Sequence, residues 1–192
     1  MAAPRPLRAD AQRNRDKLIA VALEAFSADG EVALETVAKR AGVGIGTLYR
    51  HFPTREALVE AVYRSELAKL CDAVPALLAE LPPEQAMRAW MDRFVDYMGT
   101  KQGMGDALKA VIASGADPFS ESRRLLLDAV ATLLDASGDL GEHVRPMDVL
   151  GTLGGVALAA VELSDREQAA RMLDLVMDGL RYRSGRATSD QR

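Results

Sequence analysis

The amino-acid sequence predicts an all-α protein, and three observations support this. Apolar side chains recur at helical spacing in successive segments, and no segment alternates apolar and polar residues as a half-buried strand does. Glycine and proline separate these segments, most clearly at Gly42, Pro53 and Leu81-Pro82-Pro83. The pattern predicts an N-terminal domain of three helices with a helix-turn-helix, followed by a larger C-terminal helical domain.

The chain of 192 residues is long enough for one large domain or two small ones, and its 48% hydrophobic content is that of a globular protein. We expect a flexible basic arm over residues 1–10, with a solvated tail as the alternative. The expected helix-turn-helix domain covers 11–53, and a connecting helix starts at 54 and runs to about 71. A helical domain over 72–183 and a disordered tail over 184–192 complete the prediction.

The first helix is expected over residues 11–28, where Leu18, Ala22 and Phe26 share one face and Asp29-Gly30 ends the helix. A second apolar pattern ends at Gly42, which can adopt the left-handed conformation that closes a helix. A third, very short pattern follows and stops before Pro53. Two short helices joined by a tight turn form a helix-turn-helix, a motif that reads DNA.

Two segments in this region, Ala38–Val43 and Gly46–Leu58, closely resemble the N-terminal domain of TetR-family transcriptional regulators. The remainder is similar to the family in length and helical character, and to its SbtR-like subgroup. The resemblance implies a homodimer that binds a palindromic operator in double-stranded DNA, and a repressor that a small apolar or aromatic effector releases. The alternative is a helical ligand-binding or adaptor protein that binds no operator.

The resemblance also implies which residues bind DNA. Arg50 could read a guanine, Tyr49 and His51 resemble a phosphate-binding pair, and Arg55 resembles a basic phosphate anchor. For single residues, packing of Tyr49, capping by His51 and an ion pair of Arg50 remain alternatives. The full DNA-binding set is Gly44, Ile45, Gly46, Thr47, Tyr49, Arg50, His51 and Arg55, with Arg13, Arg15 and Lys17 as candidates on the first helix.

The chain departs from the family at the second helix, where Val32-Ala33 replaces the usual capping threonine, so we expect a cap weaker by roughly 1 kcal/mol. Gly44 and Ile45 replace a common serine and lysine; Ile45 could contact a thymine methyl instead.

Two features of the C-terminal domain suggest further sites. Methionine and aromatic side chains gather in one stretch and predict either an apolar ligand pocket or plain core packing; they are Trp90, Phe94, Tyr97, Met98, Met104, Leu108 and Ile112. Glycines interrupt the helix expected over 146–163, which predicts close helix packing, either within the chain or in a dimer. The expected dimer residues are Gly151, Gly154, Gly155, Leu158, Leu173 and Met177.

Composition argues against other classes of protein. The two histidines and one cysteine complete no recognised metal or nucleophile motif, so we expect no cofactor, no metal and no enzyme. Residues 1–50 hold eight Lys or Arg and six Asp or Glu, whereas the whole chain has a net charge of −4, so a mildly basic N-terminal region precedes an acidic remainder. We expect no secretory signal and no membrane span, and a single Cys71 fits the reducing cytoplasm.

Overall fold

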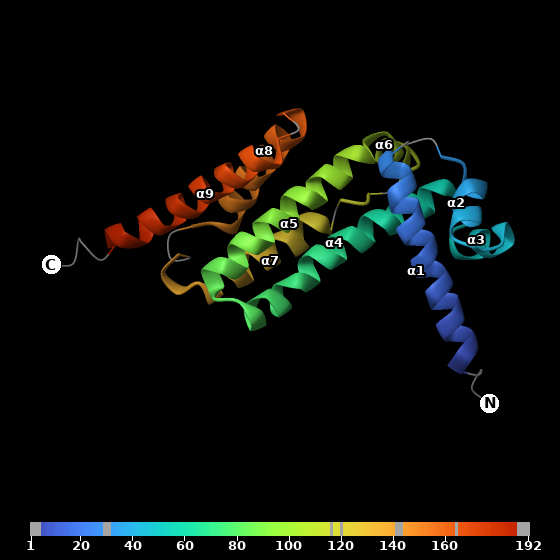
Figure 1. Ribbon diagram of the computed structural model, residues 1–192, viewed down its shortest axis with the longest axis horizontal. Coiled ribbons are helices and arrows are strands. Elements are labelled where there is room, and N and C mark those ends of the chain that lie inside the picture. Colours follow the sequence, from blue (N-terminus) through green and yellow to red (C-terminus); the bar gives the residue numbers. More distant parts are fainter. Residues whose placement is uncertain are drawn as a thin grey trace. The chain divides into compact units, whose positions relative to one another are not determined.

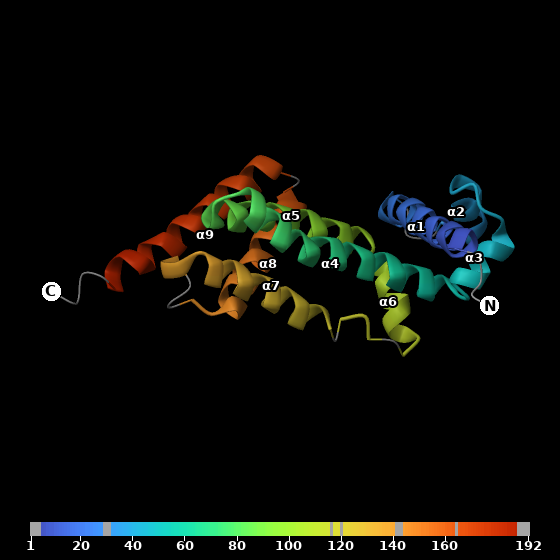
Figure 2. The same ribbon diagram turned by 90° about the horizontal axis from the view of Figure 1, so that it is seen from below.

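The computed structural model describes residues 5–28, 32–115, 117–119, 121–140, 144–163 and 165–187. These residues form nine α-helices and one 3-10 turn, and no strand occurs among them (Figures 1 and 2). The all-α prediction is therefore confirmed. The chain divides into two compact units, Met1–Glu66 with Thr100–Pro118, and Leu67–Gly99 with Phe119–Arg192.

The first unit contains helices α1 (Arg5–Ala28), α2 (Leu34–Arg40), α3 (Ile45–His51) and α6 (Gly105–Ala113), with the start of α4 (Arg55–Glu80). Helices α1, α2 and α3 pack on one another around a core that is almost fully buried. That core includes Leu18, Ala22, Phe26, Val37, Leu48, Phe52, Leu58 and Val62. Apolar residues at helical spacing thus form the predicted three-helix arrangement.

Helix α1 begins earlier than the sequence pattern indicated. We expected a flexible arm over residues 1–10, but residues 5–10 are helical. Arg5 and Pro6 occupy the first turn, where a proline is tolerated because its missing N–H would have no partner within the helix. Residues 1–4, the expected helix-ending pair Asp29-Gly30, and the last residues of the expected tail, 188–192, lie outside the described residues. Residues 184–187 of that tail belong to helix α9 (Arg166–Ala187).

Helix α4 continues through Pro75 to Glu80, whereas we expected it to end near Cys71. An internal proline removes one backbone hydrogen bond and costs about 3 kcal/mol. Apolar side chains on both sides of it, Val74 and Leu77, are only 3% and 4% exposed. Their burial offsets the local penalty, so packing overrides the helix-breaking signal.

The second unit is built from the remainder of α4 with α5 (Pro83–Gly103) up to residue 99, α7 (Ser122–Ala136), α8 (Pro146–Leu163) and α9. Helix α8 packs between α7 and α9, and the short turn η1 (Gly138–Leu140) contacts α7 and α9. Figures 1 and 2 show α8 and α9 side by side. The indole nitrogen of Trp90 donates a hydrogen bond to the Leu70 carbonyl at 3.0 Å, which ties α5 to α4 inside this core.

The methionine and aromatic stretch is divided between the two units. Trp90, Phe94 and Tyr97 are buried, and successive rings lie 5.7 and 6.3 Å apart, as in an aromatic core. Met98 is partly exposed, next to them on α5. Met104 and Leu108 are buried in the other unit, whereas Ile112 is 48% exposed. Trp90, Phe94 and Tyr97 thus pack in the core of one unit, and Met104, Leu108 and Ile112 belong to the other, so a ligand pocket lined by this set stays a prediction.

Helix α8 is long and apolar enough to cross a membrane by length and composition alone. One such helix is weak evidence for a span, because an apolar helix that packs against other helices meets the same criteria. Here Val149, Leu153, Val156 and Ala157 are buried inside the unit, and the other apolar residues of α8 are partly or fully exposed.

Candidate DNA-binding interface

The turn between α2 and α3 is closed by a specific backbone motif. Gly42 has φ of +66°, which an L side chain rarely adopts. Its N–H donates to the Lys39 carbonyl at 3.2 Å, and the Val43 N–H donates to the Ala38 carbonyl at 3.0 Å. These two bonds form a Schellman motif, which ends α2 and turns the chain toward α3. The predicted helix-turn-helix is therefore present.

Helix α3 has one buried side and one exposed side. Leu48 is fully buried, and Phe52, which follows the helix, is 2% exposed. On the other side Ile45 is 39% and Tyr49 44% exposed, and Arg50 is exposed too. Such large side chains in water on so short a helix indicate a surface that contacts another molecule. Thr47 and His51 lie at the boundary and are partly exposed, while Gly44 and Gly46 leave the start of the helix open.

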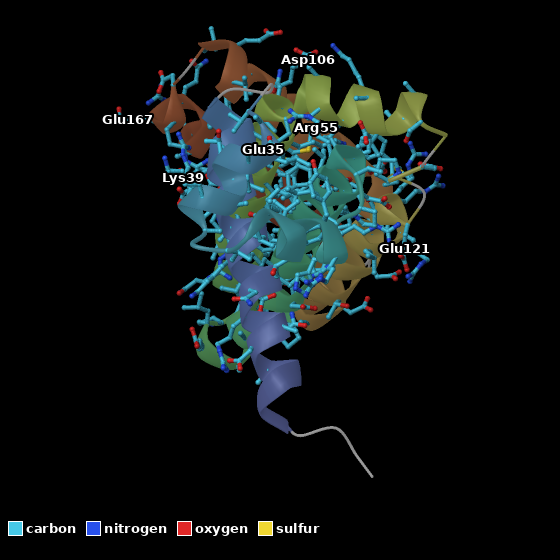
Figure 3. The ribbon with its side chains drawn as sticks, turned by 90° about the vertical axis from the view of Figure 1, so that its right-hand side faces the viewer. Glu35, Lys39, Arg55, Asp106, Glu121 and Glu167 are labelled. Carbon is cyan, nitrogen blue, oxygen red and sulfur yellow. The ribbon has the colours of Figure 1, made fainter. Side chains whose placement is uncertain are left out.

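Arg50 has no ion pair or hydrogen bond with any residue that the structure describes, so the expected alternative of a nearby carboxylate finds no support. The last turn of α2 adds two exposed cations, Lys39 and Arg40. Figure 3 shows Lys39 at the outer edge of this unit. A solvent-facing guanidinium and neighbouring cations complement the negative charge of DNA phosphates and can donate to base edges in a groove.

The helix ends near this surface behave as the sequence indicates. Ala33 provides no side-chain cap for α2, as expected from the missing threonine. The Thr54 hydroxyl accepts a hydrogen bond from the Ala57 N–H at 3.1 Å and caps α4. This cap fixes where α4 starts after the Phe52-Pro53 break.

Arg55, which resembles the family's basic phosphate anchor, makes contacts within the protein. Its guanidinium carbon lies 4.7 Å from the centre of the Phe26 ring, and one of its nitrogens donates to the Val32 carbonyl. The side chain, labelled in Figure 3, is only partly exposed. These contacts hold Arg55 against the protein.

The cations of α1 separate into three cases. Arg13 pairs with Asp10, and Lys17 is exposed. The guanidinium of Arg15 stacks on the Phe52 ring at 5.4 Å, beside a hollow of about 470 Å³ that His51, Glu60 and Arg64 also line. Sequence reasoning could not single out Arg15, because its partner Phe52 lies far along the chain. Stacking orients Arg15 beside the same hollow as His51, at the end of α3.

Part of the predicted dimer set lies on an exposed surface of α8 and α9. Gly151 and Gly155 are exposed, Gly154 is partly exposed, and Leu158 is 51% exposed. A Cβ added at any of these glycines would meet nothing within 4 Å, so close packing within the described chain does not explain them. Leu173 and Met177 are only 0% and 2% exposed. They pack inside their own unit, and the prediction that they face a partner is corrected.

Other positions on α9 are exposed where Leu173 and Met177 are buried. Leu175 and Tyr182 are 71% and 69% exposed, and Gly179 lies between them at helical spacing. We call the exposed positions of both helices the α8–α9 face; it consists of Gly151, Gly155, Leu158, Leu175, Gly179 and Tyr182. A hollow of about 490 Å³ lies between the two helices and includes Leu175 and Gly179 in its lining.

The second unit also contains a hollow of about 730 Å³ near the start of α5. Its arginines are paired: Arg88 donates to Asp174 at 2.8 Å, and Arg181 donates to Glu84 at 2.9 Å. These bonds join α5 to α9. No group of three His, Cys, Asp or Glu side chains that could hold a metal occurs in the described part of the chain, and His143 lies outside it.

Two family models match the chain. "Bacterial regulatory proteins, tetR family" matches residues 18–62, and "Transcriptional regulator SbtR-like, C-terminal domain" matches residues 82–182. A curated HTH-type transcriptional regulator from Staphylococcus aureus is 35% identical over 63 residues, which span 32% of this chain and 34% of that protein.

Solved structures match over nearly the whole length. A TetR transcriptional regulator from Streptomyces coelicolor is 54% identical with a TM-score of 0.80, and covers 86% of this chain and 97% of its own. A TetR transcription regulatory protein from Mycobacterium vanbaalenii is 32% identical with a TM-score of 0.74, over 91% and 98% of the two chains. LfrR from Mycobacterium smegmatis, solved with proflavine, is 20% identical over 90% and 96% with a TM-score of 0.62, and shows the fold alone.

The relatives with these domains are transcriptional regulators, and the helix-turn-helix geometry agrees with that role. Because the SbtR-like domain alone spans more than half of the sequence, the chain belongs to the TetR family of DNA-binding transcriptional regulators.

Proposed function

We propose that two copies of this chain bind a palindromic operator in the cytoplasm and repress transcription until a small apolar or aromatic effector releases them. The observation that carries the proposal is the exposed side of α3, where Ile45, Tyr49 and Arg50 face solvent while Leu48 anchors the helix. A recognition helix needs such a division between a core side and a groove side. The set Gly44, Ile45, Gly46, Thr47, Tyr49, Arg50 and His51 is our proposed DNA contact.

The α8–α9 face supports the dimer. It presents apolar side chains and glycines to solvent, and small residues allow two helices to approach closely. A two-fold axis through such a face brings the same residues together from both copies. The two recognition helices would then enter successive major grooves, with half-site centres roughly 34–36 Å apart or a multiple of that.

The effector acts on the balance between two states of the dimer, which differ in the separation of the recognition helices. A ligand that favours a different separation of the recognition helices weakens operator binding by its differential affinity for those states. LfrR, which shares the fold, was solved with proflavine, so that compound is a reasonable first probe for an aromatic effector. Trp90 is the only tryptophan and is fully buried, so its fluorescence reports changes inside the second unit.

The test is selection of bound duplexes from a random DNA pool, followed by sizing of the complex. An inverted repeat bound by one or two dimers is the expected result. Failure to enrich any sequence at low salt, where phosphate contacts are strongest, would contradict operator binding and favour the ligand-binding or adaptor alternative. The enriched operator then allows a screen of aromatic compounds for release, with proflavine as the first probe. Trp90 fluorescence without DNA separates binding to the protein from intercalation into the duplex.

A further inference from the structure

We propose that Arg55 is a positioning residue that holds the two ends of the helix-turn-helix together and does not bind DNA phosphate. The inference rests on the proposed operator binding, and it names the residue that keeps the reading surface in place. It reverses the role that the resemblance implied for Arg55.

Arg55 stands at the junction between the recognition helix and α4. It is the first residue of α4 and follows α3, while its hydrogen-bond partner Val32 precedes α2. The two residues are 23 positions apart and enclose the whole of α2, the turn and α3. One side-chain bond therefore closes the segment that carries the DNA-reading surface.

Arg55 binds a carbonyl that α2 leaves unused. The first carbonyl that accepts within α2 is that of Ala33, which receives the Thr36 and Val37 N–H groups. The Val32 carbonyl lies outside this helical pattern and accepts from the Arg55 guanidinium instead. Because Ala33 gives α2 no side-chain cap, Arg55 supplies a tether at the helix end where the usual threonine is missing.

Arg55 also stacks on an aromatic ring of α1. The Arg55 guanidinium lies 4.7 Å above the Phe26 ring, and Phe26 is fully buried near the end of α1. A planar cation can stack on a ring and donate in its own plane at the same time. Arg55 thus connects the start of α4 to the end of α1 and to the entry of α2. A lysine cannot reproduce this combination, since its ammonium is not planar.

Two variants, Arg55→Lys and Arg55→Ala, separate the positioning role from a phosphate contact. For a positioning role, both lower the melting temperature of the DNA-free protein, by about 3–6 °C, because the tether is lost in each. For a phosphate contact, Arg55→Lys keeps operator affinity and Arg55→Ala alone makes the salt dependence of binding shallower. The matched control is Val130→Ala, a fully buried position of α7 in the other unit, which also lowers the melting temperature.

Operator affinity is then measured at a temperature where every variant is fully folded. We expect both Arg55 variants to lose about 5- to 20-fold in affinity, with the slope of log K against log salt unchanged. Amide exchange should accelerate in α2 and α3 of both variants. Val130→Ala should leave the affinity and the exchange of these helices unchanged, because it only lowers overall stability.

Three results would overturn the proposal. One is a slope of log K against log salt that becomes shallower by about 0.9 in Arg55→Ala alone, as expected for one lost phosphate contact. The second is wild-type stability in both variants, and the third is equal loss of affinity in Val130→Ala. If the wild-type protein selected no operator, melting and amide exchange would still test the tether, so failure of the proposed function is distinguishable from failure of this inference.

Discussion

Leu158 gives the sharpest test of the proposed dimer, because its side chain is 51% exposed in the single chain and lies on the α8–α9 face. Full burial of a leucine side chain is worth about 2 kcal/mol, so covering the exposed half contributes about 1 kcal/mol. A two-fold axis places this side chain in the interface twice. The two Leu158 side chains, one from each copy, then stabilise the dimer by about 2 kcal/mol, which is about 30-fold in dissociation constant.

Leu158→Glu removes that contribution and places two unpaired carboxylates where water is excluded. Desolvation of each costs several kcal/mol, so the dissociation constant of the dimer should rise by at least about 1000-fold. Folding of the protomer should change by no more than about 0.5 kcal/mol, because the position is exposed in the chain alone. Sedimentation velocity over a dilution series measures the association, and circular dichroism checks the fold.

The matched control is Ile112→Glu. Ile112 on α6 is 48% exposed, almost the same as Leu158, but it lies outside the α8–α9 face. The Ile112→Glu substitution should leave the dimer intact. A Leu158→Glu protein that sediments like the wild type, or an Ile112→Glu protein that dissociates equally, would refute the assignment of this face.

Three further predictions concern single side chains. Arg50→Ala should cost roughly 1–3 kcal/mol of discrimination between operator and random DNA in competition binding; equal loss on both would make Arg50 a phosphate contact. Gly42→Ala should destabilise the free protein by about 1–2 kcal/mol in thermal melts, because the φ of Gly42 is +66°. Gly46→Ala, inside α3, should stabilise the protein by up to about 1 kcal/mol. A change in stability of the same sign for both variants would contradict the backbone argument. Burial, followed by two nearby carboxylates, raises the pKa of Cys71 from 9.0 to about 11, so its thiolate fraction at neutral pH falls about 100-fold. Iodoacetamide should accordingly modify the folded protein about 100-fold more slowly than the urea-unfolded chain, with equal rates as the contrary result.

Helix patterning and the helix-turn-helix could be read from local sequence. Gly42 marks the turn because only a residue without a Cβ enters φ of +66° at low cost, and this is a local property of the chain. Pro53 and Thr54 likewise mark the end of α3 and the cap of α4. Repeated apolar spacing placed the helix over residues 146–163 at the bounds found for α8.

Pairings between distant residues could not be read in this way. Pro75 locally favours a helix end, yet burial of Val74 and Leu77 keeps α4 continuous. Leu173 and Leu175 are the same residue type two positions apart, and one is buried while the other is 71% exposed. Which face of a helix is covered depends on what packs against it, and the pattern of one segment does not contain that information.

The sequence by itself determined the all-α fold, the helix-turn-helix and the DNA-reading residue types, because these follow from local backbone preferences and helical spacing. Only the tertiary structure decided that Arg50 faces solvent while Arg55 lies on Phe26 and binds the Val32 carbonyl. Both are arginines flanking the same short turn of chain. Their roles differ because charge is a property of the residue, whereas access to DNA depends on which neighbours the fold brings within reach.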